Sequence, residues 1–435
     1  MALFFTLIFL LQTAPGPACG DVAACRAQAE AAAGRGDYET FHDLAWRAVQ
    51  KGKRNDTDLM FLLARAQSLS GRPDDALVML ERIVDLGGAP EVANDPDFAP
   101  VRALPRYAEL LAKLSHSAPP ARSAAPAPVG SSTPPASAAS ASAPGPPSPS
   151  AASSARRAPD RDPAASEPPA LAFEGPPMAT AVALAHDAVS RRFVLGDRAS
   201  SRLVIIDEVS HHVVNYASAA TAGFLDELTG LALDARRGDL WVTSAKGRGA
   251  DAVSTLHKLQ LVSGRTLMEV PLPAGAGATR LVDVTVTPDG TAYVIDDAEG
   301  RLFRARPGAR RLEPVMRLDV THPTALTAAD DRVLYVAADD GLVRVDLVSN
   351  KTAPVKSVEP LTRFVSLAWR AGALVGVERV ADSFLVVRIA FDPSGTRAQP
   401  RAILAASPEP TVGTLTPEGF YYLAGPGAIR LAKLR

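Results

Sequence analysis

Six runs of the same design recur between residue 180 and the C-terminus. Each reads as an apolar strand, a tight turn containing Asp, Gly or Arg, and a second apolar strand, as in residues 229–245 (TGLALDARRGDLWVTSA) and 282–297 (VDVTVTPDGTAYVIDD). Asp and Gly suit such turns because they supply positive φ angles or side-chain hydrogen bonds to the backbone. The runs begin 41 to 53 residues apart, at Thr180, Thr229, Val282, Thr324, Val365 and Thr411.

That spacing leaves room for two further strands in each repeat. A period of about 40 to 50 residues with four strands is typical of a β-propeller blade, so residues 171–435 are predicted to form an all-β, six-bladed propeller. The last repeat ends at Arg435 after its third strand. Residues 171–173 (Leu-Ala-Phe), just upstream of the first blade, are placed to supply the missing strand and close the ring.

Residues 21–115 carry apolar side chains at helical spacing and contain a repeat of their own. Each unit reads helix, glycine turn, helix, and Gly36 of the first unit matches Gly71 of the second. Small residues such as Ala45 and Ala64 stand where two helices must approach closely. This segment resembles the tetratricopeptide family, whose period is about 34 residues. The resemblance implies a small all-α module that binds protein partners.

The segment between these two parts, residues 116–170, is rich in Pro, Ala and Ser and has almost no large apolar side chains. Such a stretch cannot bury enough surface to offset its chain entropy, so we expect a disordered linker. Residues 1–20 combine a short apolar run with small residues, which is the design of a secretory signal peptide, although no Lys or Arg precedes the run. The run is too short to span a bilayer. We therefore expect a periplasmic or secreted protein without a membrane span.

The only two cysteines, Cys19 and Cys25, lie beside the expected cleavage region. Either would be the site of a lipid anchor if the signal were of the lipoprotein type. Pro17 near Cys19 and Asp21 near Cys25 depart from that type, so the anchor stays an alternative. A thiol nucleophile or a metal pair is not indicated, because no His cluster accompanies the cysteines.

Charge and composition exclude one class of partner. The chain has 46 Lys and Arg residues against 47 Asp and Glu residues, whereas a dedicated nucleic-acid binder carries a clear basic excess. No nucleic-acid partner is therefore expected. The heavy use of Ala, Arg and Pro is typical of a GC-rich bacterial genome.

Three runs carry a resemblance to known propellers: VTPDGTAYVID, ARRGDLWVTSA and LVRVDLVSN. They are similar to blades of the NHL-repeat, TolB-like and gluconolactonase (regucalcin-like) groups. The gluconolactonase resemblance implies a divalent cation held by Glu, Asn and Asp side chains at the starts of the inner strands. The matching positions here contain one carboxylate, Asp283, among Ala181, Gly230, Asp283, Ala325, Ser366 and Val412. We therefore predict no metal, no cofactor and no catalytic residue.

Two residues before each repeat start, the aligned positions are mostly charged. If they ring one mouth of the channel, their Arg, His and Glu side chains could grip a small anionic or zwitterionic ligand, while the alternative is a solvated rim of compensating charges. Met178 is the one apolar member of this ring. The other members, together with Asp283, are the candidate ligand-binding residues: Glu227, Arg280, Asp283, His322, Arg363 and Glu409.

The sequence as a whole favours an exported, non-catalytic binding or scaffold protein. It would use the helical module for protein partners and the propeller for a second surface or a small ligand. The alternative is a divergent metal-dependent lactonase or hydrolase with a divalent cation in the channel.

Overall fold

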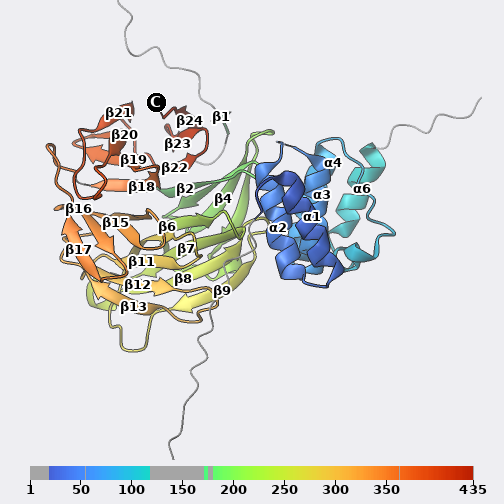
Figure 1. Ribbon diagram of the computed structural model, residues 1–435, viewed down its shortest axis with the longest axis horizontal. Coiled ribbons are helices and arrows are strands. Elements are labelled where there is room, and N and C mark those ends of the chain that lie inside the picture. Colours follow the sequence, from blue (N-terminus) through green and yellow to red (C-terminus); the bar gives the residue numbers. More distant parts are fainter. Residues whose placement is uncertain (1–18, 54, 118–170, 175–179, 362, 435) are drawn as a thin grey trace, which may run out of the picture. The chain divides into compact units, whose positions relative to one another are not determined.

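The computed structural model describes residues 19–53, 55–117, 171–174, 180–361 and 363–434 (Figure 1). The predicted linker and nearly all of the predicted signal peptide lie outside these residues. Within the described part of the chain, no helix is both long and apolar enough to cross a membrane.

The N-terminal residues form two helix pairs, as predicted: α1 (Val22–Gly34) with α2 (Tyr38–Lys51), and α3 (Thr57–Leu69) with α4 (Pro73–Asp85). Asp21 caps α1 by accepting a hydrogen bond from the backbone N–H of Ala24. Gly36 and Gly71 adopt left-handed φ angles of 73° and 76° in the two turns, a conformation that glycine adopts without steric cost. A closing group follows, comprising η1 (Pro96–Phe98), α5 (Ala99–Arg102) and α6 (Tyr107–Ser117). The tetratricopeptide assignment itself remains a prediction.

The strands form six antiparallel sheets of four strands each, which confirms the predicted propeller. From the innermost strand outwards, blade 1 consists of β2 (Ala181–Asp187), β3 (Arg192–Asp197), β4 (Arg202–Asp207) and β5 (Val213–Ser218). Blade 2 consists of β6 (Glu227–Asp234), β7 (Asp239–Lys246), β8 (Val253–Gln260) and β9 (Thr266–Pro271). Blade 3 consists of β10 (Leu281–Val286), β11 (Ala292–Asp296), β12 (Arg301–Ala305) and β13 (Glu313–Arg317).

The remaining blades repeat this order. Blade 4 consists of β14 (Ala325–Ala328), β15 (Val333–Ala338), β16 (Gly341–Asp346) and β17 (Lys351–Pro354). Blade 5 consists of β18 (Phe364–Arg370), β19 (Ala373–Val380), β20 (Ser383–Ala390) and β21 (Ala402–Ser407). Blade 6 consists of β22 (Gly413–Thr416), β23 (Gly419–Leu423), β24 (Ala428–Ala432) and β1 (Leu171–Ala172). Short helical turns, α7 (Ala219–Ala222) and η2 (Gly249–Asp251), interrupt the loops of blades 1 and 2.

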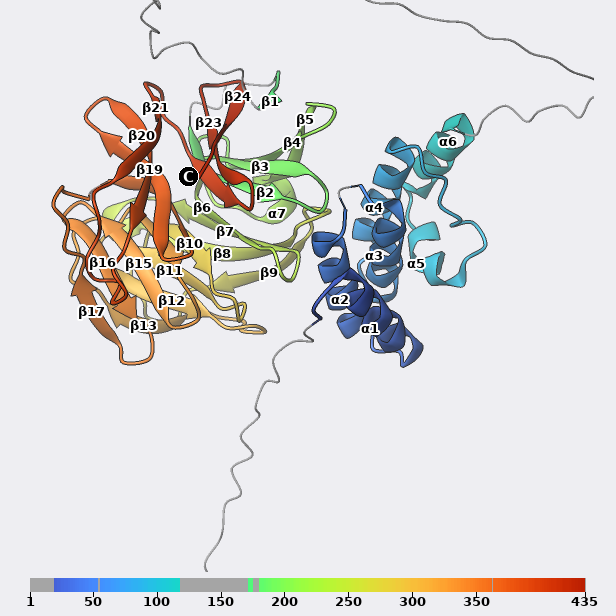
Figure 2. The same cartoon turned by 45° about the horizontal axis from the view of Figure 1, so that its top comes forward.

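The inner strands of neighbouring blades contact one another all the way round. β2, β6, β10, β14, β18 and β22 follow in that order, and β22 returns to β2. Figure 2 shows the six sheets arranged about a central axis. The ring therefore encloses a channel bordered by one strand from each blade.

Both ends of the propeller segment meet in blade 6, as the sequence predicted. β1 pairs antiparallel with β24, with Leu171 opposite Ile429 and Ala172 opposite Ala428. The N–H of Phe173 adds a hydrogen bond of 2.9 Å to the carbonyl of Gly427. Leu171, Phe173 and Ile429 are buried in one cluster with side chains of blade 1. This pairing covers part of the outer edge of β24 and fastens blade 6 to the start of the ring.

Aspartate caps the hairpin turns, as expected from the turn residues. Oδ1 of Asp187 in blade 1 accepts hydrogen bonds from the backbone N–H groups of Val189 and Ser190. In the next blade, Oδ1 of Asp234 accepts the equivalent bonds from Arg236 and Arg237. The Arg-Gly-Asp tripeptide at 237–239 belongs to such a turn. Its aspartate is 1% exposed and pairs with a lysine of β8, so the tripeptide serves the hairpin and is not displayed for recognition.

Shortening the buried side chain at the seam should weaken the whole ring. We expect Ile429→Ala to lower the free energy of unfolding by about 3 kcal/mol, because a fully buried isoleucine leaves a cavity when it is cut to alanine. Ile403→Ala is the matched control, since Ile403 on β21 is 59% exposed. Chemical unfolding followed by circular dichroism measures both. Equal, small effects would contradict the role of the seam.

Candidate ligand-binding site at the channel mouth

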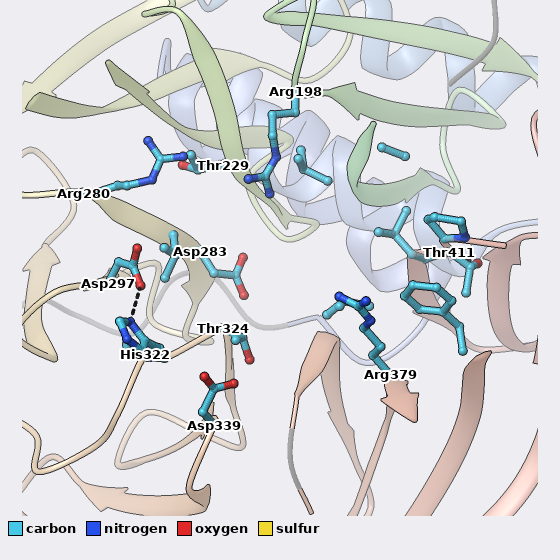
Figure 3. A pocket seen from close by; sticks show the side chains of 18 of the residues that line it. Arg198, Thr229, Arg280, Asp283, Asp297, His322, Thr324, Asp339, Arg379 and Thr411 are labelled. Atoms are coloured by element: carbon cyan, nitrogen blue, oxygen red, sulfur yellow. Dashed lines mark hydrogen bonds and ion pairs between the residues drawn. The ribbon is translucent and has the colours of Figure 1, made fainter. Parts of the chain in front are cut away.

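A cavity of about 690 Å³ lies at the end of the channel where the inner strands begin (Figure 3). Its volume is within the range of small-molecule sites. Every blade contributes to its wall, with one representative from each being Val182, Thr229, Asp283, Thr324, Val365 and Thr411. The cavity therefore exists only because the ring is closed.

A β-bulge shapes the wall in four of the six inner strands. The pairing register skips one residue at Val182, Thr229, Val282 and Val365, and all four residues line the cavity. A bulge leaves one residue outside the ladder and re-aims its side chain.

The bulges also correct the sequence alignment in blade 1. There Val182, and not Thr180, occupies the position of Thr229. The alignment was two residues out in this blade, and a shift of two residues leaves the alternation of side chains along a strand unchanged. Met178, proposed as a rim residue from that alignment, lies outside the described residues.

Two inner strands approach unusually closely beside the cavity. A Cβ atom at Gly230 of β6 would lie 2.7 Å from the Cα of Asp283 and 2.9 Å from the Oγ1 of Thr243. Only a residue without a side chain fits between these neighbours. Gly230 thus lets β10 bring Asp283 against β6.

Two arginines share one carboxylate on the mouth. Nη2 of Arg280 donates to Oε2 of Glu227 at 2.6 Å, and Nη2 of Arg248 donates to Oε1 of the same residue at 3.0 Å. Burial alone would raise the pKa of Glu227, but the hydrogen bond and charge of Arg280, helped by Arg248 and Arg198, outweigh it and lower the pKa. Three guanidinium groups therefore face one carboxylate, and this sector keeps a positive charge.

Arg198 and Arg379 point into the cavity from opposite sides (Figure 3). Neither side chain makes a hydrogen bond or ion pair with another described residue. Arg198 is accessible from the opening, but partial burial by the channel walls lowers its pKa. The positive charges of Arg280 and Arg248 also lower this pKa, whereas the negative charge of Glu227 raises it. These two guanidinium groups are available to a ligand.

Blades 3 and 4 contribute two aspartates to the wall, Asp297 and Asp339, which form the acidic sector. Nδ1 of His322 lies 3.5 Å from Oδ1 of Asp297, and Nε of Arg363 lies 3.5 Å from Oδ1 of Asp339. His322 and Arg363 both adopt left-handed φ angles, of 45° and 56°. A non-glycine residue in this region costs about 1 to 3 kcal/mol and is concentrated at functional sites.

Asp283 lies in the channel wall between the two sectors. Its Oδ1 accepts the N–H of Val284 at 2.8 Å, and its Oδ2 accepts the N–H of Leu326 in the next blade at 3.0 Å. Burial nevertheless raises the pKa of Asp283 to about 7, because these two hydrogen bonds only partly offset the loss of solvent. The carboxyl group changes charge near neutral pH.

The structure brings together five of the six predicted residues. Arg280, Asp283 and His322 line the cavity, while Glu227 and Arg363 bind residues that line it. Glu409 is the exception. The two flanking prolines line the cavity, but its carboxylate lies toward Gly425.

The sequence analysis missed six charged residues of the mouth: Arg198, Arg248, Asp297, Asp339, Arg379 and Asp382. Each lies at the end of the second strand of its blade or just after it. The backbone N–H of Arg198, Asp297 and Arg379 bonds to a rim carbonyl of the same blade, that of Thr180, Arg280 and Arg363 respectively. The repeat alignment, read at the end of the second strand, would have found this second ring.

The residues of the mouth do not fit the divalent cation that the gluconolactonase resemblance implied. Hard cations need several converging oxygen ligands. Here Asp283 accepts two backbone N–H groups, Asp297 faces a histidine, and Asp339 faces an arginine. In the described ranges no group of three or more His, Cys, Asp or Glu side chains is placed to hold a metal ion.

A serine and a histidine meet elsewhere in blade 2. Oγ of Ser244 lies 2.9 Å from Nε2 of His257, and burial lowers the pKa of this histidine to about 4. Both residues are fully buried, so no substrate reaches the hydroxyl. The pair is a packing element of the blade.

No protein-family model and no curated protein matches the sequence. Solved structures of similar shape include the major allergen of Malassezia sympodialis, with 14% identity over 60% of this chain and 94% of that chain and a TM-score of 0.47. A gluconolactonase from Xanthomonas campestris has 16% identity over 61% and 88% of the two chains and a TM-score of 0.47. A virginiamycin B lyase from Staphylococcus aureus has 14% identity over 58% and 79%, with a TM-score of 0.43. The fold assignment rests on the strand pairing described above.

Adding one carbon at Gly230 should strain the wall of the cavity. We expect Gly230→Ala to lower the free energy of unfolding by about 2 kcal/mol, because the new methyl group overlaps backbone atoms of blade 3. Gly34→Ala is the control, since it is helical and no atom outside its own helix lies within 4 Å of the added carbon. A thermal unfolding midpoint measured for both separates local overlap from a general effect of losing glycine. An unchanged midpoint for Gly230→Ala would show that β6 and β10 are not this close.

Proposed function

We propose that this protein is an exported, non-catalytic binding protein whose propeller captures a small molecule by its anionic group at the channel mouth. The observation that carries this proposal is Arg280. The residue is only 6% exposed, and its buried Nη1 has no hydrogen-bond partner among the described residues. A small shift of this side chain toward the cavity would let a ligand oxygen bond to Nη1 and complete the site.

The energetic cost of an unpaired buried charge distinguishes this site from a solvated rim of charges. Leaving a buried polar group unpaired costs about 1 to 3 kcal/mol, and more for a charged one. Arg198 and Arg379 supply two further guanidinium groups without partners, aimed into the same cavity. Guanidinium groups bind carboxylate and phosphate through paired hydrogen bonds. The mouth therefore supplies three cationic donors for one anionic group.

Export is supported by a covalent bond near the N-terminus. Cys19 and Cys25 form a disulfide, and such bonds persist in oxidising compartments such as the periplasm or the extracellular space. A thioether-linked lipid would need a free sulfur at one of these residues, so the disulfide and the lipid anchor exclude each other. We propose the disulfide form. The intact mass of the protein before and after reduction, measured from periplasmic and secreted fractions, tests it.

Removing either free arginine should weaken anion binding. With N-acetyl-trialanine as the anionic probe, we expect Arg198→Met and Arg379→Met each to raise the dissociation constant about ten-fold or more, the effect of losing one charged hydrogen bond. Arg332→Met, an exposed arginine outside the cavity, should change nothing. Isothermal titration calorimetry measures all four proteins. Calcium binding at the mouth, with calcium-dependent lactone hydrolysis lost in Asp283→Ala, would replace this proposal with the hydrolase.

Anion binding should strengthen as the pH falls through neutrality. Below a pKa of about 7 the Asp283 carboxyl is neutral, so an anion nearby no longer meets its negative charge. We expect the affinity for N-acetyl-trialanine to rise about three- to ten-fold between about pH 8 and about pH 6. Asp283→Asn, which is neutral throughout, should flatten this part of the profile. A profile identical in the two proteins would contradict the assignment.

A further inference from the structure

We infer that the ligand of the channel mouth is a zwitterion of peptide size, held by its anionic group on the arginine sector and by a cationic group on the acidic sector. This inference rests on the proposed function and specifies its ligand. It follows from the balance of charge, the separation of charge and the size of the cavity.

The charges that line the cavity are balanced. Four arginines and four aspartates contribute to the wall: Arg198, Arg248, Arg280, Arg379, Asp283, Asp297, Asp339 and Asp382. A ligand that carried negative charge alone would meet as many carboxylates as guanidinium groups. A ligand with one charge of each sign is compensated at both ends.

The two signs are unevenly distributed around the mouth. Arg198, Arg248 and Arg280 come from blades 1 to 3 and act on the single carboxylate of Glu227. Figure 3 shows the carboxyl groups of Asp283 and Asp339 on one side of the space into which Arg198 and Arg379 point. The charge distribution of the cavity is therefore asymmetric, and a dipolar molecule would bind in one orientation.

The acidic sector retains capacity for a donor. A charge-assisted N–H···O bond is about 2.7 to 2.9 Å long, whereas Asp297 and Asp339 lie 3.5 Å from His322 and Arg363. These partners hold the carboxylates in place without saturating them. An ammonium group, with three N–H donors, could bond to either aspartate.

The size of the cavity excludes the smallest zwitterions as good ligands. Its volume of about 690 Å³ is far larger than one amino acid, and Arg198 belongs to blade 1 whereas Asp339 belongs to blade 4, on the opposite side of the ring. A molecule must be several bonds long to reach both. A short peptide with free termini has its two charges at opposite ends and meets this requirement.

Three peptides that differ by one charge test the inference: trialanine, N-acetyl-trialanine and trialanine amide. The first is a zwitterion, the second an anion and the third a cation. By isothermal titration calorimetry we expect trialanine to bind at least ten-fold more tightly than either blocked peptide. Asp339→Asn should weaken trialanine and leave N-acetyl-trialanine unchanged, whereas Arg198→Met should weaken both.

The exposed Glu91 of the helical segment provides the control, because Glu91→Gln removes one carboxylate far along the sequence from the mouth. Thermal midpoints confirm that each variant folds. If N-acetyl-trialanine binds as tightly as trialanine, the inference is wrong and the proposed anion site stands. If no peptide with a free carboxylate binds, or if only the amide does, the proposed function itself fails.

Discussion

Pairing between β1 and β24 is the interaction on which the propeller depends. Two residues from the start of the segment complete the sheet at its end, and their apolar neighbours are buried against blade 1. Without this seam, blades 1 and 6 would be the two ends of an open array. The channel mouth takes part of its wall from each blade, so the seam is a condition for the site as much as for the fold.

The site follows from the ring by small departures from regular strand geometry. Bulges turn four inner-strand residues toward the cavity, and two rim residues hold left-handed backbones. Charged side chains then come from two rings, one before the inner strand and one after the second strand. The strands fix the spacing of these charged side chains, and the residue types at the strand ends and in the loops determine their charge. This division of labour is common in proteins whose function lies on loops of a rigid scaffold.

Sequence reasoning reached the blades, their count and the closing strand because these depend on period and turn chemistry, which are local. It reached Arg280, Asp283 and His322 because the repeat alignment was correct in their blades. It missed Arg198 and Arg379 because no apolar pattern marks the end of a second strand. It expected Glu409 on the rim with the others, whereas the Glu409 carboxylate lies toward Gly425. The disulfide between Cys19 and Cys25 was also missed, since each cysteine beside the predicted signal peptide was weighed singly as a possible lipid-anchor site.

Gly230 has a consequence for how such a site can diverge. Strands β6 and β10 can lie this close together because Gly230 has no side chain. The width of the opening therefore depends on a residue that no ligand needs to contact. Exchanges among the rim arginines and aspartates can alter which molecules are accepted while the aperture stays constant. A substitution at this glycine would instead change the calibre of the opening for every ligand at once.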